Sequence, residues 1–314
     1  MSLFKRVAII GQGLIGSSLT RAIQARQPDA EVVITDASPK VRQRLRELGL
    51  GQAKVTDTSM EAVQGADLII ACVPVSRIGS VAEEIGGHIR PGALFSDVGS
   101  VKGAVVRDVT PHLPPQIHFI PAHPVAGTEH SGPDSGMADL FENRWCILTP
   151  APDADQAAVE KVRSLWQAMG STVEVMSVED HDYVLAITSH LPHLIAFTIF
   201  HTALRHEEKT HSEVMKFSAG GFRDFTRIAS SNPTMWRDIF LNNKAAVLGA
   251  LKEFQADITA LAAAIERDDA EKLVDELSKS RLTRRKVIEK EHISLAPKKA
   301  KDEIAIVPPY GWSD

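Results

Sequence analysis

The sequence predicts an N-terminal α/β domain built on a doubly wound parallel sheet, followed by an all-α C-terminal domain. Short β-branched runs alternate with helical stretches through the first half of the chain, and a glycine-rich turn follows the first run. After Ser177 the strand patterns stop and helical periods replace them. With 314 residues the chain has room for two domains, since about 150 residues make one.

The predicted strands of the first domain are short apolar runs rich in Val and Ile. They are Arg6–Ile10, Glu31–Thr35, Leu68–Val73, Leu94–Val98 and His118–Ile120, with further strands at Cys146–Leu148 and Thr172–Met176. The predicted helices between them are Leu14–Arg26, Pro39–Leu48, Met60–Gln64 and Gln156–Met169. We place this domain at residues 1–177.

Helical periodicity predicts a second domain at residues 178–293 and a tail at residues 294–314. One apolar stripe recurs at spacings of three and four along a long helix: Leu251, Phe254, Ile258, Leu261 and Ile265. The run Asp268–Glu271 then predicts a stop and a D-x-x-E cap for a last helix. The stripe needs a partner surface, which is either the core of the same chain or a second copy.

The stretch Val184–Leu204 contains no Asp, Glu, Lys or Arg, but it includes Pro192 and three histidines. These residues are costly in lipid, so we expect a buried helix and no membrane partner. The N-terminal residues 1–10 lack a small-residue cleavage site and read as a first strand rather than a signal peptide.

Composition excludes several classes of function. Lys and Arg total 35 against 40 Asp and Glu, so the formal charge of −5 predicts no nucleic-acid partner. Cys72 and Cys146 are too few for a disulfide framework or a thiolate metal cluster. We therefore expect a cytoplasmic protein without a metal site.

A dinucleotide site is predicted by the turn after the first strand. Its sequence is Gly11-Gln12-Gly13-Leu14-Ile15-Gly16, which matches G-x-G-x-x-G between a strand and a helix. The glycines permit a tight turn, close approach of the backbone to a pyrophosphate, and close packing of helix on strand. The helix N-terminus adds backbone amides and a favourable dipole.

Asp36 ends the second strand, where an acidic residue would bind a ribose 2′-hydroxyl. A carboxylate repels a 2′-phosphate and no arginine follows directly, so NAD is favoured over NADP. Val73 and Pro74 leave the next buried strand at its carboxyl end and are expected to line the nicotinamide side of the cofactor site.

Four further segments carry the chemistry. They are Asp97–Lys102 (DVGSVK), His123–Gly132 (HPVAGTEHSG), Ser189–His193 (SHLPH) and Gly221–Ala229 (GFRDFTRIA). In this order they resemble the prephenate and arogenate dehydrogenases of tyrosine biosynthesis, also called cyclohexadienyl dehydrogenases, over roughly Arg6 to Glu291. The resemblance implies a Rossmann domain followed by a helical dimerisation domain, in a homodimer that oxidatively decarboxylates prephenate or arogenate. With no chorismate mutase or regulatory segment expected, it implies a monofunctional member.

The resemblance also implies roles for individual residues. His123 matches the catalytic histidine, which as a neutral imidazole takes the proton of the ring hydroxyl while hydride leaves the same carbon. Ser100 matches a serine near that hydroxyl, and Arg227 matches an arginine that holds a substrate carboxylate. Further matches around the substrate are Arg223, Glu129, His181 and His193.

Two other functions stay open on the residues alone. A β-hydroxyacid dehydrogenase of the same architecture would carry a catalytic lysine on the first interdomain helix, but Tyr183–Leu204 contains none. A non-catalytic NAD-binding sensor would leave His123, Ser100 and Arg227 without a joint purpose.

Overall fold

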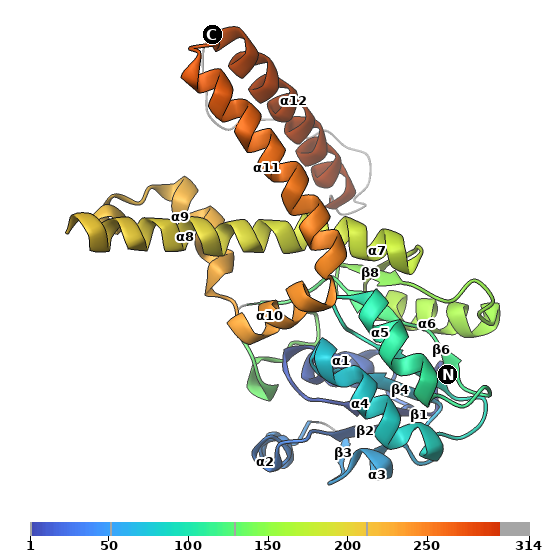
Figure 1. The fold of residues 1–314 in the computed structure, drawn as a ribbon. Coiled ribbons are helices and arrows are strands. Elements are labelled where there is room, and N and C mark those ends of the chain that lie inside the picture. The colour runs from blue at the N-terminus through green and yellow to red at the C-terminus, as the bar shows by residue number, and fades with distance from the viewer. Residues whose placement is uncertain (1, 51, 129, 212, 296–314) are drawn as a thin grey trace, which may run out of the picture. The chain divides into compact units, whose positions relative to one another are not determined.

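The computed structural model describes residues 2–50, 52–128, 130–211 and 213–295 (Figure 1). The described residues form two compact units, which divide between Phe254 and Gln255. The change from alternating strands and helices to helices alone lies at Ser177, inside the first unit. The division of the chain into domains at that residue stays a prediction.

The main sheet of the first unit has six parallel strands in the order β3-β2-β1-β4-β5-β6. Their bounds are β1 (Arg6–Ile10), β2 (Glu31–Thr35), β3 (Lys54–Val55), β4 (Leu68–Ala71), β5 (Leu94–Asp97) and β6 (His118–Phe119). This is the strand order of the Rossmann fold, so the predicted fold class is confirmed. The carboxyl ends of β1 and β4, on either side of the switch point, meet at one edge of the sheet.

Helices cover both faces of this sheet, because alternate residues of each strand point to opposite sides. Val7 and Ile9 of β1 belong to one apolar cluster, and Ala8 and Ile10 belong to another. The first cluster includes side chains of α1 (Leu14–Arg26), α2 (Pro39–Leu48) and α6 (Gln156–Ala168). The second includes side chains of α3 (Ser59–Val63), α4 (Val75–Ile85) and α5 (Lys102–Val109).

A second sheet of three strands, which the sequence does not predict as a separate sheet, follows β6. It consists of β7 (Ala122–Pro124), β8 (Trp145–Leu148) and β9 (Thr172–Val175). β7 runs antiparallel to β8, with His123 opposite Ile147, and β8 runs parallel to β9. Three residues are too few for an alternating pattern, so β7 left no signal in the sequence.

One long helical path begins the helical part of the first unit (Figure 1). It runs through α7 (Val178–Leu185), a π-helical turn η4 (Ala186–His190) and α8 (Leu191–Thr210). By length and composition alone, the stretch Val178–Thr210 could cross a membrane, a weak indication because core helices pass the same test. The predicted burial of Val184–Leu204 is wrong for the single chain, since Val184 and Ile199 are exposed. A lack of charged residues does not require burial within the same chain.

Short elements connect the longer ones within the described residues. They are η1 (Gly86–His88), η2 (Thr110–His112), η3 (Pro133–Ser135), η5 (Val214–Phe217), α9 (Gly220–Thr226), η6 (Arg227–Ser230) and α10 (Pro233–Asn242). α11 (Lys244–Glu266) begins in the first unit, where Leu251 and Phe254 pack against a small apolar cluster.

The second unit contains the end of α11 and α12 (Ala270–Leu295). The predicted helix stop is confirmed, since Asp268 has a left-handed φ of +52°. The cap lies one residue later than the predicted one, because Asp269 Oδ1 accepts the hydrogen bond from Lys272 N at 3.0 Å. Ile258 and Ile265, in the second half of the apolar stripe, are exposed.

Candidate active site

The turn after β1 leaves no room for a side chain at two of its glycines. Gly11 has a φ of +91°, and a Cβ there would lie 2.6 Å from the carbonyl oxygen of Cys72. A Cβ on Gly16 would lie 2.0 Å from the carbonyl oxygen of Gly11. At Gly13 a Cβ would meet no atom within 4 Å. The turn is closed towards the protein and open at Gly13, next to the N-terminus of α1, as a pyrophosphate site requires.

Asp36 follows β2 at the same edge of the sheet. Its carboxylate accepts hydrogen bonds from the N–H groups of Gln12 and Ser38, each at 2.8 Å, and is therefore fixed beside the glycine turn. The other predicted cofactor residues are half-buried or exposed around this turn and at the end of β4: Leu14, Ile15, Val73 and Pro74. These residues form an open surface at the carboxyl edge, where ligands of such sheets bind.

A buried ion pair at the end of β5 holds the start of β7. The side chains of Asp97 and Lys102 are fully buried, and Lys102 Nζ donates a hydrogen bond to Asp97 Oδ2. Lys102 Nζ also donates to the carbonyl oxygen of Ala122 at 2.7 Å, while Asp97 Oδ1 accepts from Ala122 N at 3.3 Å. Both backbone groups of the residue before His123 are bound by this pair, which fixes the position of β7 against the main sheet.

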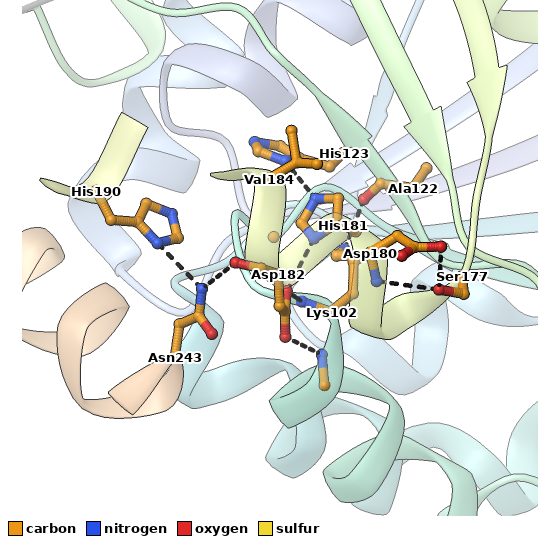
Figure 2. A network of polar contacts seen from close by, with 12 residues as sticks. Lys102, Ala122, His123, Ser177, Asp180, His181, Asp182, Val184, His190 and Asn243 are labelled. Atoms are coloured by element: carbon orange, nitrogen blue, oxygen red, sulfur yellow. Dashed lines mark hydrogen bonds and ion pairs between the residues drawn. The ribbon is translucent and has the colours of Figure 1, made fainter. Parts of the chain in front are cut away.

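His123 is buried in β7, and its Nδ1 lies 2.9 Å from Nε2 of His181 (Figure 2). Burial lowers the pKa of His123 well below its ordinary value, and the charges of His181 and Lys102 lower it further. The ring is therefore neutral at pH 7 and can accept a proton. No hydrogen bond to Nε2 of His123 is found among the residues that the structure describes.

His181, fully buried in α7, connects His123 to Asp182. Nδ1 of His181 lies 2.8 Å from Asp182 Oδ1. The same carboxylate accepts hydrogen bonds from the first two N–H groups of α5, those of Lys102 and Gly103, each at 2.8 Å. Burial raises the pKa of Asp182, but these hydrogen bonds lower it by more, so the side chain is ionised at pH 7. Burial also lowers the pKa of His181, in spite of Asp182.

A second polar cluster joins the end of α10 to the π turn (Figure 2). Asn243 Nδ2 donates to the carbonyl oxygen of Asp182 at 2.8 Å and lies 3.2 Å from Nδ1 of His190. Burial lowers the pKa of His190 to about 4. One turn later, the ring of His193 stacks on Trp236 with 3.7 Å between centroids. These contacts fix the helical part of the site beside β7.

The side chains of Ser100, Arg223, Arg227 and His193 form no hydrogen bond with His123 within the described residues. Ser100 is half-buried between β5 and α5, and its hydroxyl forms no hydrogen bond within the described part of the chain. Arg227 is exposed at the start of η6. η6 packs against α8, the helix that carries His193. Burial lowers the pKa of His193, and the charge of Arg227 lowers it further. Arg223 is exposed on α9, and Glu129 lies outside the described residues.

Sequence reasoning missed the polar residues that support His123. They are Asp97, Lys102, Asp182 and Asn243. It also missed His190, which contacts Asn243, and Trp236, which stacks on His193. Asp97 and Lys102 belong to the DVGSVK segment, where a lysine soon after a buried strand was a usable signal. Asp182 is next to His181, but an acidic residue near the start of a helix is normally read as a solvated side chain.

Two protein-family models match the chain. Residues 19–175 match the nucleotide-binding domain of prephenate dehydrogenase, and residues 177–279 match the dimerization domain of prephenate dehydrogenase. Together the two matches cover most of the chain and meet where the strands end.

Curated relatives with similar sequences have consistent names. A cyclohexadienyl dehydrogenase of Zymomonas mobilis is 43% identical over 284 residues, covering 90% of this chain and 96% of the relative. A prephenate dehydrogenase of Bacillus subtilis is 36% identical over 268 residues, covering 85% of this chain and 72% of the relative.

Solved structures agree with these matches. The prephenate dehydrogenase of Aquifex aeolicus in complex with hydroxyphenyl propionate and NAD+ superposes with a TM-score of 0.83 at 33% identity, covering 90% of this chain and 98% of that chain. The Synechocystis arogenate dehydrogenase superposes with a TM-score of 0.76 at 25% identity, covering 90% of this chain and 99% of that chain.

Proposed function

Because the chain belongs to the prephenate dehydrogenase family, we propose that it catalyses the NAD-dependent oxidative decarboxylation of prephenate or arogenate. The products are 4-hydroxyphenylpyruvate from prephenate and tyrosine from arogenate. The observation that carries this proposal is a neutral, buried histidine at the carboxyl edge of a Rossmann sheet, whose Nε2 has no hydrogen-bond partner among the residues that the structure describes. The β-hydroxyacid dehydrogenase and the non-catalytic sensor are not favoured by the relatives named above.

The residues of the glycine turn fit NAD. Gly11 and Gly16 bring the turn against β4 and α1, and the open position at Gly13 leaves room for a pyrophosphate next to the N-terminus of α1. Asp36 holds a carboxylate at the end of β2, suited to the two ribose hydroxyls of the adenosine half. Bound NAD would supply the hydride acceptor.

His123 acts as the general base in this proposal. Its Nε2 takes the proton of the ring hydroxyl while the hydride leaves the carbon that bears that hydroxyl. The resulting ketone then loses the ring carboxylate as carbon dioxide, and the electron pair of the broken bond makes the ring aromatic. Ser100, three residues beyond the end of β5, would hydrogen-bond the same hydroxyl.

Arg227 binds a substrate carboxylate in this proposal. It is exposed at the start of η6, which packs against α8, and a guanidinium offers two parallel donors to a carboxylate. Arg223 lies one helical turn earlier and adds positive charge on the same segment. Glu129 is proposed at the substrate entrance on the family resemblance alone. His181 supports His123 through the contact with its Nδ1.

A homodimer through the helical part of the chain explains its exposed apolar surface. In the first unit, a cavity of about 860 Å³ opens beside α8 and is lined by Ile199, Ala203 and Phe222 among others. In the second unit, Ile265 and Leu277 are each more than 60% exposed. Surfaces of this kind mark protein interfaces, and the matched family model is a dimerization domain. The partner is a second copy, in a cytoplasm that keeps Cys72 and Cys146 reduced.

A steady-state assay tests this function. The purified chain is given prephenate or arogenate, each with NAD or NADP, and nucleotide reduction is followed. We expect turnover with NAD and at least one of the two substrates. No turnover with any of the four combinations, in a protein that still binds NAD, would favour the sensor.

The role of His123 has its own test. Replacement by Asn should lower kcat by on the order of 100-fold to 10,000-fold, with a much smaller change in KM. His130→Asn is the matched control, because His130 is an exposed histidine of the same segment and should keep wild-type turnover. A His123→Asn enzyme with most of its turnover would make this histidine structural.

A further inference from the structure

Asp182 caps a helix that has no cap of its own. The N-cap residue of α5 is Val101, whose side chain forms no hydrogen bond to the helix end. The N–H groups of Lys102 and Gly103 donate instead to the two carboxylate oxygens of Asp182, which comes from α7. A Cβ on Gly103 would lie 2.9 Å from Asp182 Oδ2, so glycine makes room for this carboxylate. The macrodipole of α5 favours a negative charge there.

These contacts decide which nitrogen of His181 carries a proton. An ionised carboxylate has only acceptor positions, and Nδ1 of His181 lies 2.8 Å from Asp182 Oδ1. The hydrogen bond therefore requires a proton on Nδ1. Because the buried ring of His181 is neutral, its Nε2 is left with a lone pair.

The same reasoning extends to His123. The lone pair on Nε2 of His181 faces Nδ1 of His123 at 2.9 Å, so the proton of this hydrogen bond must come from His123. His123 is then protonated on Nδ1, and its Nε2 carries the lone pair that a general base needs. A neutral imidazole free in water favours the opposite form, with the proton on Nε2.

We propose that Asp182 is a positioning residue that acts through His181 to set the tautomer in which Nε2 of His123 is the proton acceptor. The catalytic consequence rests on the proposed role of His123 as base. The tautomer itself does not depend on any substrate. Asn243, which donates to the backbone carbonyl of Asp182, keeps α7 in place behind the two rings.

Nitrogen NMR reads the tautomers directly, because protonated and unprotonated ring nitrogens have well separated shifts. The full-length chain is labelled with ¹⁵N-histidine and studied at pH 7 without substrate. The signals of His123 and His181 are assigned by their loss in His123→Asn and His181→Asn. We expect Nδ1–H on both rings. A proton on Nε2 of His123 in the wild-type chain overturns the proposal.

Steady-state kinetics of Asp182→Asn provide a second test of the proposal. The amide can turn its NH₂ group towards His181, which reverses both hydrogen bonds and puts the proton of His123 on Nε2. We expect kcat to fall on the order of 100-fold to 10,000-fold with little change in KM, as when the orienting acid of a catalytic triad is replaced. Asp180→Asn is the matched control, since Asp180 is exposed in the same helix and bonds Ser177. It should keep wild-type kcat.

The outcomes separate this proposal from the proposed function. A lower kcat in Asp182→Asn with an unchanged tautomer of His123 means that the carboxylate only supports the fold, and it overturns the proposal. If Asp182→Asn does not fold, the nitrogen spectrum of the wild type still tests the proposal, because a proton on Nε2 of His123 overturns it. A wild-type chain that shows the expected tautomers but oxidises neither prephenate nor arogenate contradicts the proposed function. It does not contradict the hydrogen bonds from Asp182 through His181 to His123 or the tautomers that they set.

Discussion

The buried His190 should make the stability of the fold depend on pH. Burial lowers the pKa of this histidine to about 4 from an ordinary 6.5. Below pH 6.5 the unfolded chain binds this proton and the folded chain does not, so the folded state loses stability as the pH falls. The difference between the two pKa values corresponds to about 3 kcal/mol in full, of which about 2 kcal/mol is lost between pH 7 and pH 5.

Urea unfolding at pH 7 and pH 5, at one protein concentration, measures this effect. His190→Gln retains an acceptor for Asn243 but has no titrating group. The free energy of unfolding of the wild type should therefore drop by about 2 kcal/mol more than that of the variant between the two pH values. Contributions of groups that do not interact with His190 cancel in this comparison. His88→Gln, which changes an exposed histidine, should behave as wild type. Equal pH dependence in wild type and His190→Gln would refute the reasoning.

Three further predictions concern ligands. Gly16→Ala should prevent stable folding or NAD binding, because its Cβ would lie 2.0 Å from the carbonyl oxygen of Gly11. Gly13→Ala should fold, since its Cβ meets no atom of the protein within 4 Å, and calorimetry should show weaker NAD binding. The wild type should use NAD far better than NADP, and Asp36→Ala should reduce that preference in kcat/KM, so equal wild-type values would contradict the ribose role. Arg227→Ala should raise KM for prephenate roughly tenfold to a hundredfold while NAD binding is kept, since a charge-assisted hydrogen bond is worth about 1.5 to 3 kcal/mol. An unchanged KM would mean that Arg227 is an ordinary surface arginine with no part in substrate binding.

Local patterns were sufficient for most of the first sheet. β1 and β2 have the predicted bounds because each is a run of buried Val and Ile between polar residues, and the helix α1 follows its glycine turn as predicted. The strands that were missed are too short for a pattern, as in Lys54–Val55, or depend on a partner strand far along the chain, as in Ala122–Pro124.

The site shows the same limit. His123 could be predicted because its segment is specific, and its partner His181 was noticed only as a matching residue. Their contact spans 58 positions of the chain and depends on how α7 lies against α5, which no local period encodes. From the sequence, Asp182 is an ordinary acidic residue in the middle of α7, and its role is visible only once the N-terminus of α5 lies beside it.

The π turn at Ala186–His190 sets the phase between the two helices that it joins. A π turn contains one residue more than an α turn along the same path. If the same number of residues wound as an unbroken α-helix, everything after this turn would be rotated by about 100° around the helix axis, because each residue of an α-helix turns by that angle. His181 would keep its contact with His123, while His193 would swing off the face of Trp236. The wider winding of this turn, which takes up one extra residue, therefore holds the two groups of histidines in register.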